Sequence, residues 1–280
     1  SVWPAGSPLR TGKIISSIAR NFHPGYLFLE PNPYRRMSYN NFVQSIISDT
    51  QFLQPPDIEY AKYHSKRFYI TYQSCMKFLK KGDKVLSIGA GIASIEKMLA
   101  KNGIEITVVD FGGVVDAFKP YYDYLGFKSC KGIYFSDNLD LQEGHFDMDL
   151  CSEVVEHIPL DPYLQLQNVM KHMSKKATVV ISTPNLGSIL HIIKLLFMKP
   201  ILESPAVTFG EVNAENQGVH RREYLPSEIH QSYQKAGLEP LKTKYFYYTD
   251  RLTFSQVVLK LFGALIPRFR PGMLLIGVRK

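Results

Sequence analysis

The sequence predicts an α/β fold built on a doubly wound, mostly parallel sheet of seven strands, with an N-terminal helical cap. Two observations predict this fold. Between residues 84 and 185, short apolar runs rich in β-branched residues alternate with longer helix-like segments, which is typical of βαβ units. Two more strand-like runs follow near the end of the chain. The 280 residues, 45% hydrophobic and 21% charged, are enough to bury a substantial core.

The alternating segment contains five expected strands and three expected helices. We expect the strands over residues 84–90, 104–111, 128–135, 146–152 and 177–182. We expect the helices between them over residues 92–102, 114–125 and 162–173. Because three of the four connections between these strands contain a helix, the strands should pair in parallel.

A different pattern follows Pro184. An apolar stretch over residues 188–198 leads into a polar loop that ends near Gly218. A helix then follows over about 226–236, because Pro226 is a favourable first residue and Gly237 a favourable stop. The last two strands are expected over residues 241–249 and 273–278.

The first 80 residues are rich in Tyr, Phe, Pro and Asn and carry one helical run, over about 57–80. We predict that residues 1–80 form a cap, mostly helix and loop, beside the cleft of the following domain. That domain is predicted over residues 81–280, with an insert on the ligand side at about 186–225.

Charge and cysteine content limit the functional classes. The net charge of +8 divides into +6 for residues 1–80, −4 for residues 81–185 and +6 for residues 186–280. Basic flanks either are ordinary solvated surface or attract an anionic substrate or a membrane surface. No recognition-module signature points to nucleic acid. The three cysteines follow no metal spacing, so we expect reduced thiols in a cytoplasmic protein.

Apolar runs in the sequence are too short for a membrane span. A bilayer-spanning helix needs about 20 consecutive apolar residues, and no run reaches that length. We therefore do not expect a transmembrane protein. The chain begins at Ser1 rather than at Met, which we interpret as a processing boundary.

A glycine turn follows the first expected strand. Gly89 and Gly91 permit a tight turn and the close approach of a ligand to the backbone, and the next helix offers free N–H groups. Asp110 ends the second strand 19 residues after Gly91. A carboxylate there can accept hydrogen bonds from both ribose hydroxyls of a nucleoside. The two features together favour a nucleoside-containing ligand.

An acidic turn follows the fourth expected strand. Residues 146–158, FDMDLCSEVVEHI, run from the strand directly into Glu153, Glu156 and His157. In a doubly wound sheet the end of this strand lies beside the glycine turn. Residues 151–157 should therefore line the reactive end of the ligand.

At this point the sequence resembles the class I S-adenosylmethionine-dependent methyltransferases, over about residues 80–280. The matching motifs are SIGAG (87–91), VVD (108–110), FDMDLCSEVVEHI (146–158) and STPN (182–185). The resemblance implies a Rossmann-like sheet with a reversed last strand, S-adenosylmethionine as cofactor and methyl transfer as the reaction. The tail from Ser182 to Tyr224 looks like that of bacterial members acting on glycans, lipids or secondary metabolites.

The resemblance also assigns site residues. It implies that residues 89–91 cradle the methionine part of the cofactor, that Asp110 holds the ribose, that Asp137 neighbours the adenine, and that residues 151–153 flank the sulfonium. The expected cofactor-binding residues are Ser87, Gly89, Ala90, Gly91, Asp110, Phe111, Asp137, Cys151, Ser152 and Glu153.

Two positions depart from the family pattern. Ser87 stands where the family often has Asp or Glu, so the charge attraction for the cofactor's ammonium is lost although a hydrogen bond remains. Ala93 stands at the third glycine position. A nicotinamide-dependent oxidoreductase is one alternative, but its fingerprint requires glycine where this chain has Ser94. A non-catalytic binding protein of the same fold is another.

Methyl transfer to oxygen requires a group that takes the hydroxyl proton. His157 and His220 are the candidate bases, and Glu153 is a third catalytic candidate, as an orienting residue together with Glu156. A structural role for each histidine stays open. Glu153, Glu156 and His157 are similar to a segment of the ubiquinone-pathway O-methyltransferases, some of which use a divalent metal. Without further oxygen ligands they do not define such a site, and we expect no metal.

The acceptor is the least determined part of the prediction. We expect a hydroxyl of a sugar or glycolipid, with a quinone-like phenol or an amine as alternatives. Arg221 and Arg222 could pair with an anionic acceptor or lie on the surface. The apolar runs 189–198 and 252–266 could contact a membrane or a lipid-linked acceptor, or pack as core or dimer helices.

Overall fold

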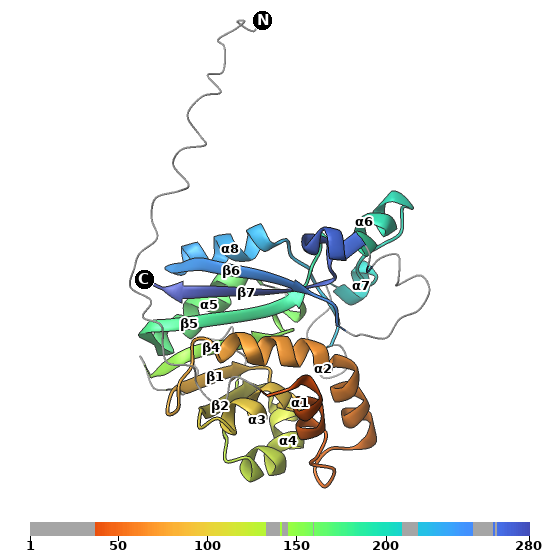
Figure 1. Ribbon diagram of the computed structural model, residues 1–280. Helices are drawn as coiled ribbons and strands as arrows, with labels where there is room; N and C mark the ends of the chain where they lie inside the picture. The colour runs from red at the N-terminus through yellow and green to blue at the C-terminus, as the bar shows by residue number, and fades with distance from the viewer. Residues whose placement is uncertain are drawn as a thin grey trace, which may run out of the picture. The chain divides into compact units, whose positions relative to one another are not determined.

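A seven-stranded sheet runs through the computed structural model of the chain, with strand order β3-β2-β1-β4-β5-β7-β6 (Figure 1). The structure describes residues 37–132, 141, 145–158, 160–208, 218–248, 260 and 262–280, all within one compact unit, Tyr34–Lys280. The strands are β1 (Lys84–Ile88), β2 (Glu105–Asp110), β3 (Lys128–Lys131), β4 (Phe146–Ser152), β5 (Met173–Pro184), β6 (Leu238–Phe246) and β7 (Gly272–Arg279).

Strand directions confirm the predicted fold class. Strands β1 to β5 pair in parallel, and β7 runs antiparallel to both of its neighbours, β5 and β6. The last strand in the sequence is therefore the reversed one. Strand β4 has the predicted bounds, whereas β5 begins earlier than expected, at Met173, because the chain turns directly from the end of a helix into the sheet.

Helices cover both faces of the sheet. They are α1 (Tyr39–Ile46), α2 (Pro55–Cys75), α3 (Ser94–Ala100), α4 (Gly112–Tyr124), α5 (Pro162–His172), α6 (Ile189–Leu196), α7 (Pro205–Thr208) and α8 (Pro226–Lys235). There are also two short 3₁₀ helices, η2 (Val155–His157) and η3 (Pro267–Phe269), and residues 262–265 are helical. Helices α1 to α4 pack into one buried apolar cluster, and α5 and α8 pack into a second.

Alternation along the strands separates the two clusters. On β1, Val85 belongs to the cluster of α1 to α4, whereas Leu86 and Ile88 belong to the cluster of α5 and α8. This is the period-two pattern of a strand buried on both faces. Ser87, on the first of these faces, is the polar exception, and its partner is described below.

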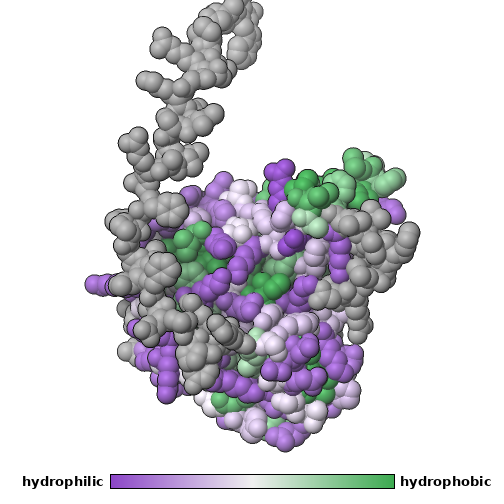
Figure 2. Space-filling model, in the orientation of Figure 1, coloured by the Kyte–Doolittle hydropathy of each residue, from purple (hydrophilic) through white to green (hydrophobic). Residues whose placement is uncertain are grey.

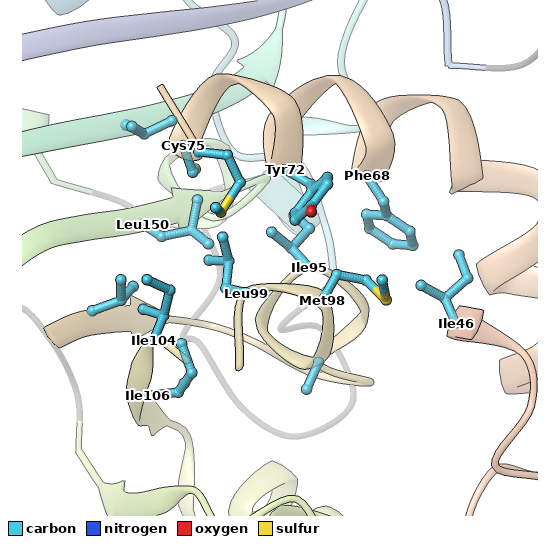
Figure 3. Packing of buried hydrophobic residues seen from close by; sticks show 14 of the residues in the cluster. Ile46, Phe68, Tyr72, Cys75, Ile95, Met98, Leu99, Ile104, Ile106 and Leu150 are labelled. Carbon is cyan, nitrogen blue, oxygen red and sulfur yellow. The ribbon is translucent and has the colours of Figure 1, made fainter. Parts of the chain in front are cut away.

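The N-terminal helices belong to the same core as the sheet. Figure 3 shows Phe68, Tyr72 and Cys75 of α2 directed toward Met98 and Leu99 of α3. Helix α2 begins after Gln54, whose backbone N–H donates to Asp57 Oδ2 at 2.9 Å, a hydrogen bond that caps its first turn. An ion pair of 2.6 Å between Lys97 and Asp49 fastens α3 to the segment after α1.

No helix in the described part of the chain is long and apolar enough to cross a membrane. Cys75, Cys130 and Cys151 are all free thiols.

Candidate functional site

The carboxyl ends of β2, β1 and β4 lie side by side. Ile88 at the end of β1 is in register with Val109 of β2 on one side and Cys151 of β4 on the other. The glycine turn, Asp110 and Glu153 each follow or end one of these strands. The fold therefore brings the three sequence features together at one edge of the sheet, where ligands bind in doubly wound folds.

Each glycine of the turn has its own physical reason. Gly89 has φ +68°, and a Cβ there would lie 2.5 Å from Val154 Cγ2, so no side chain fits. Gly91 has φ +50°, but a Cβ there would meet nothing within 4 Å. The space above Gly91 is therefore open to a ligand, while the left-handed conformation still favours glycine. The turn is closed by a hydrogen bond from the Gly89 N–H to Val109 O at 2.9 Å.

Asp110 ends β2 with its carboxylate turned toward this turn. Its Oδ1 accepts from the Phe111 N–H at 2.8 Å, and its Oδ2 accepts from the Gly91 N–H at 3.3 Å. Burial raises the pKa of Asp110 above its ordinary value, and these two hydrogen bonds partly oppose that rise. Each carboxylate oxygen can accept a second hydrogen bond, so two hydroxyl groups of a ligand could still bind.

Ser87 is hydrogen-bonded to an acidic side chain of the next helix. Its Oγ donates to Glu96 Oε1 of α3 at 2.6 Å, and both side chains are buried. Burial raises the pKa of Glu96 to about 7, although the hydrogen bond from Ser87 opposes the rise. A carboxylate is therefore present beside the end of β1 after all, supplied by the next helix. The sequence analysis did not identify Glu96.

Two of the residues expected beside the sulfonium have side chains bound elsewhere. Cys151 is fully buried, and its Sγ accepts from Gln165 Nε2 of α5 at 3.2 Å. Burial raises the pKa of the Cys151 thiol well above its ordinary value. Ser152 Oγ lies 2.9 Å from Ser182 Oγ of β5. The Cys151 side chain therefore lies in the core, whereas Ser152 is half-buried. Asp137 lies outside the described residues.

Glu153 is held by side chains from three distant segments. Its Oε1 accepts from Ser182 Oγ at 2.9 Å, and its Oε2 accepts from Tyr248 Oη at 2.9 Å. Arg67 of α2 lies 3.2 Å from the same Oε2. Glu153 also adopts φ +58°, a conformation that costs about 1–2 kcal/mol for a non-glycine residue. Its N–H donates to Ser182 O at 2.8 Å, which holds this conformation.

Arg67 is the cation of this network. It is 4% exposed, packs over the rings of Phe68 and Tyr248, and donates to Tyr60 Oη at 3.1 Å. Burial opposes its charge most strongly, but Glu153, Tyr60 and Tyr248 together outweigh burial and raise the pKa of Arg67. Both carboxylate oxygens of Glu153 are therefore bound by other side chains of the protein.

Glu156 is the most deeply buried acid of the turn. Its Oε2 accepts from Thr183 Oγ1 at 2.9 Å, whereas its Oε1 is buried without a hydrogen-bond partner. Burial and then the neighbouring Glu153 raise the pKa of Glu156 well above its ordinary value. The STPN motif is thus explained, because Ser182 and Thr183 each donate to one acid of the turn.

A pocket of about 550 Å³ has Glu153 in its wall. Its volume is in the range of small-molecule sites. It is lined by Tyr60, Tyr63, His64, Arg67, Glu153, Glu156, His157, Pro184, Ser188, Leu190, His191, Gly218, His220, Glu223, Tyr248 and Pro271. The pocket therefore joins the N-terminal helices, the acidic turn and the segment after β5. Both candidate bases, His157 and His220, line it.

The two candidate bases differ in environment. The rings of His157 and His220 lie edge to face with centroids 5.0 Å apart. His157 Nδ1 is 3.0 Å from Val219 O, and burial lowers the pKa of His157 to about 4. Its ring is therefore neutral at pH 7 and a weak base. The side chain of His220 is 40% exposed, and its Nδ1 lies 3.5 Å from Glu223 Oε1.

Glu223 links two histidines of the pocket. Its Oε2 lies 3.2 Å from His191 Nδ1, and its Oε1 faces His220. The side chain of Glu223 is 7% exposed, so its charge acts in a poorly solvated environment. Glu223 is therefore within ion-pair distance of both imidazoles at the pocket.

Among the described residues, one group could hold a metal ion. Glu156, His157 and His220 each offer one ligand atom, and these atoms lie within 4.8 Å of one another. The separation of 3.9 Å between His157 Nε2 and Glu156 Oε1 is too long for a hydrogen bond. Two imidazoles and one carboxylate suit zinc or another transition metal better than magnesium.

Arg221 and Arg222, the two arginines of the predicted insert, line a second pocket of about 430 Å³. Arg221 is buried and donates from Nη1 to Thr208 O at 3.0 Å. Arg222 is exposed and pairs with Glu228 of α8 at 2.5 Å. Both guanidinium groups therefore already have partners within the chain.

Several residues of the site gave no signal in the sequence. Arg67 and Tyr248 come from segments far from the motifs, and only the tertiary fold brings them to Glu153. Glu223 lies three residues after His220, but the sequence analysis gave it no role. Tyr248 belongs to an aromatic run, YFYY, over residues 245–248. Of that run, Phe246 is buried and the other three residues are half-buried.

A sheet of this order with a reversed last strand is the fold of the class I S-adenosylmethionine-dependent methyltransferases. The methyltransferase domain family matches residues 61–243, a range that includes both the glycine turn and the acidic turn. The chain belongs to this family and is an S-adenosylmethionine-dependent methyltransferase. The match decides against the oxidoreductase alternative. No curated protein matches the chain.

Solved structures share the fold at low sequence identity. A SAM-dependent methyltransferase from Archaeoglobus fulgidus is 17% identical with a TM-score of 0.54, covering 81% of this chain and 100% of its own. A SAM-dependent methyltransferase from Methanosarcina mazei is 13% identical with a TM-score of 0.52, covering 74% and 96%. The [4+2]-cyclase SpnF is 13% identical with a TM-score of 0.53, covering 76% and 81%. At such identities the likeness shows the fold alone.

The residues at the strand edge fit the cofactor. The open space above Gly91 would admit its methionine part, and Asp110 retains acceptor capacity for the ribose hydroxyls. The buried Ser87–Glu96 pair places a carboxyl group beside the strand that leads to the glycine turn.

Proposed function

We propose that this methyltransferase methylates a hydroxyl group of a sugar, glycolipid or related small molecule, with His220 as the general base. The observation that carries the proposal is the pairing of His220 with the poorly exposed Glu223 in the pocket beyond Glu153. A carboxylate that orients an imidazole in this way is the arrangement that activates hydroxyl nucleophiles.

The mechanism assigns a role to each group. S-adenosylmethionine supplies an electrophilic methyl group. The acceptor hydroxyl approaches in line, its oxygen forms the new bond to the methyl carbon, and its proton passes to the imidazole of His220. The products are S-adenosylhomocysteine and the methyl ether. Glu223 fixes the ring of His220, and Arg67 with Glu153 holds the acidic turn in place.

His157 is the weaker choice of base. Its low pKa, caused by burial, leaves it with little affinity for the proton of a hydroxyl. We assign it a packing role against His220 and the backbone of the insert. A phenol or an amine as acceptor would need less help from a base. A large effect of the His220 variant on turnover is therefore expected only for hydroxyl acceptors.

The experiment is a transfer assay with labelled cofactor on panels of hydroxylated sugars and glycolipids, phenols and amines. For the hydroxyl acceptors, we expect His220→Asn to lower kcat by roughly 100-fold or more with binding of S-adenosylhomocysteine unchanged, and His157→Gln to lower it much less. Transfer only to phenols or amines, or an unaffected His220→Asn, would sink the proposal.

Treatment of the protein with a chelator distinguishes base catalysis from metal catalysis. An ion held by Glu156, His157 and His220 would activate the same hydroxyl by lowering its pKa. Base catalysis by His220 predicts full turnover after treatment with EDTA. Loss of turnover that Mn²⁺ or Zn²⁺ restores would replace the base assignment with a metal site.

The three cysteines, none of which forms a disulfide, support a cytoplasmic location for the reaction.

A further inference from the structure

Helix α6 is strongly apolar and amphipathic, yet it is not part of the core. Its sequence, ILHIIKLL, contains six aliphatic residues, its two polar residues His191 and Lys194 share one face, and none of its eight residues is buried. An amphipathic helix with an exposed apolar face and a basic residue on its polar face is typical of helices that lie in a membrane interface. Ser188 caps its start by accepting from the His191 N–H at 3.3 Å, so the helix is a defined element.

The end of α6 exposes large apolar side chains. Leu196 is 76% exposed, Phe197 72% and Met198 92%. Figure 2 shows a hydrophobic surface at this end of the molecule, over α6. Leu265, near η3, is 82% exposed, and the chain around η3 is fixed to the start of α6 because Asn185 Nδ2 donates to Arg268 O and Arg270 O at 2.8 Å.

Basic residues surround this apolar surface. Lys194 and Lys199 lie within and directly after α6, and Arg268 is exposed beside Leu265. The only acidic residue in the described part of the segment 186–208 is Glu203. An apolar surface with a basic rim complements a bilayer that contains anionic lipids, as in interfacial helices.

The same helix forms a wall of the acceptor pocket. Ser188, Leu190 and His191, at the start of α6, line that pocket. At 1.5 Å per residue, Phe197 lies about 10 Å along the axis from Leu190. The exposed end of α6 therefore lies about two helical turns from the pocket wall.

We propose that α6 and the following Phe197 and Met198 form a membrane-docking surface that inserts into the interface of a bilayer containing anionic lipid. Docking in this way places the pocket wall formed by Leu190 and His191 close to the lipid headgroups. The proposal concerns binding to the bilayer and does not depend on which group is methylated.

Flotation of the full chain with lipid vesicles tests the proposal. We expect the chain to float with vesicles of phosphatidylcholine mixed with phosphatidylglycerol, more weakly with phosphatidylcholine alone, and less at high salt, which screens the lysines. Failure to float with the anionic vesicles would overturn the proposal. Because no acceptor is present, this failure would leave the proposed reaction intact.

A matched pair of variants localises the surface. Leu196→Glu on α6 should lower vesicle binding roughly tenfold or more, whereas Leu164→Glu, the same change at an exposed position of α5, should leave it unchanged. Binding of S-adenosylhomocysteine by both variants shows that they are folded. Equal flotation of the two variants would contradict the proposal. A second contradictory result would be a chain that does not float but forms a concentration-dependent dimer in sedimentation, if Leu196→Glu abolishes that dimer.

Discussion

Glu96 of α3 brings a carboxyl group to the position where β1 lacks one, at Ser87. The hydrogen bond of 2.6 Å from Ser87 Oγ places its carboxylate against the strand that leads to the glycine turn. Because burial raises the pKa of Glu96 to about 7, this group changes charge near physiological pH. The affinity for a cationic ammonium should therefore depend on pH in that range.

We predict that the affinity for S-adenosylmethionine rises as pH increases through about 7, since the carboxylate of Glu96 then ionises and attracts the ammonium. Glu96→Gln should remove this dependence and weaken binding roughly tenfold above that pH, the size of a charged hydrogen bond. Titration calorimetry below and above the pKa measures both effects. Glu105→Gln, at an exposed position of β2, is the control. An unchanged pH profile in Glu96→Gln would refute this role.

Residues predicted from the sequence are those whose function is local. Gly89, Gly91 and Asp110 follow from backbone turns and strand ends, which a short stretch of sequence determines. Glu96 and Arg67 act through partners on other elements, so no local pattern marks them. Cys151 was expected at the sulfonium from its position alone. The structure places its side chain in the core, where strand alternation directs it.

At the scale of elements, the sequence was most informative where strands are buried. Strand β4 was predicted to the residue, and the reversed β7 completes the expected sheet. Helix ends were less predictable, because α3 begins at Ser94 after Ala93 takes a left-handed conformation, φ +51°. The apolar run 189–198 left core and membrane roles open. Only the exposure of α6 separates them, because periodicity does not report what covers a helix.

Across the whole molecule, one buried acid stands out. Asp149 lies within β4, 1% exposed, with neither carboxylate oxygen hydrogen-bonded. Burial raises its pKa from 3.8 to about 8. Between these two values the folded chain holds a proton that the unfolded chain has lost. The contribution of Asp149 to the free energy of unfolding is thus complete below pH 3.8 and is lost as pH rises through about 8.

Asp149→Asn should remove this loss, because an amide does not ionise. We predict that the variant gains stability relative to the unmodified chain as pH rises toward 8, and that the difference grows with pH across this window. Thermal unfolding of both chains over the pH range measures the difference. Asp116→Asn, at an exposed position of α4, should show no such trend. Parallel pH profiles for Asp149→Asn and the unmodified chain would contradict the prediction.

Isothermal titration with S-adenosylmethionine and S-adenosylhomocysteine tests most directly whether the glycine turn and Asp110 form the cofactor site. We predict micromolar binding to the unmodified chain, as expected for a cofactor held at a glycine turn and a strand-end carboxylate. That binding should be lost in Asp110→Ala and retained in Asp116→Ala, whose carboxylate is exposed on α4. Equal affinity of the two variants, or no binding to the unmodified chain, would contradict this assignment of the site.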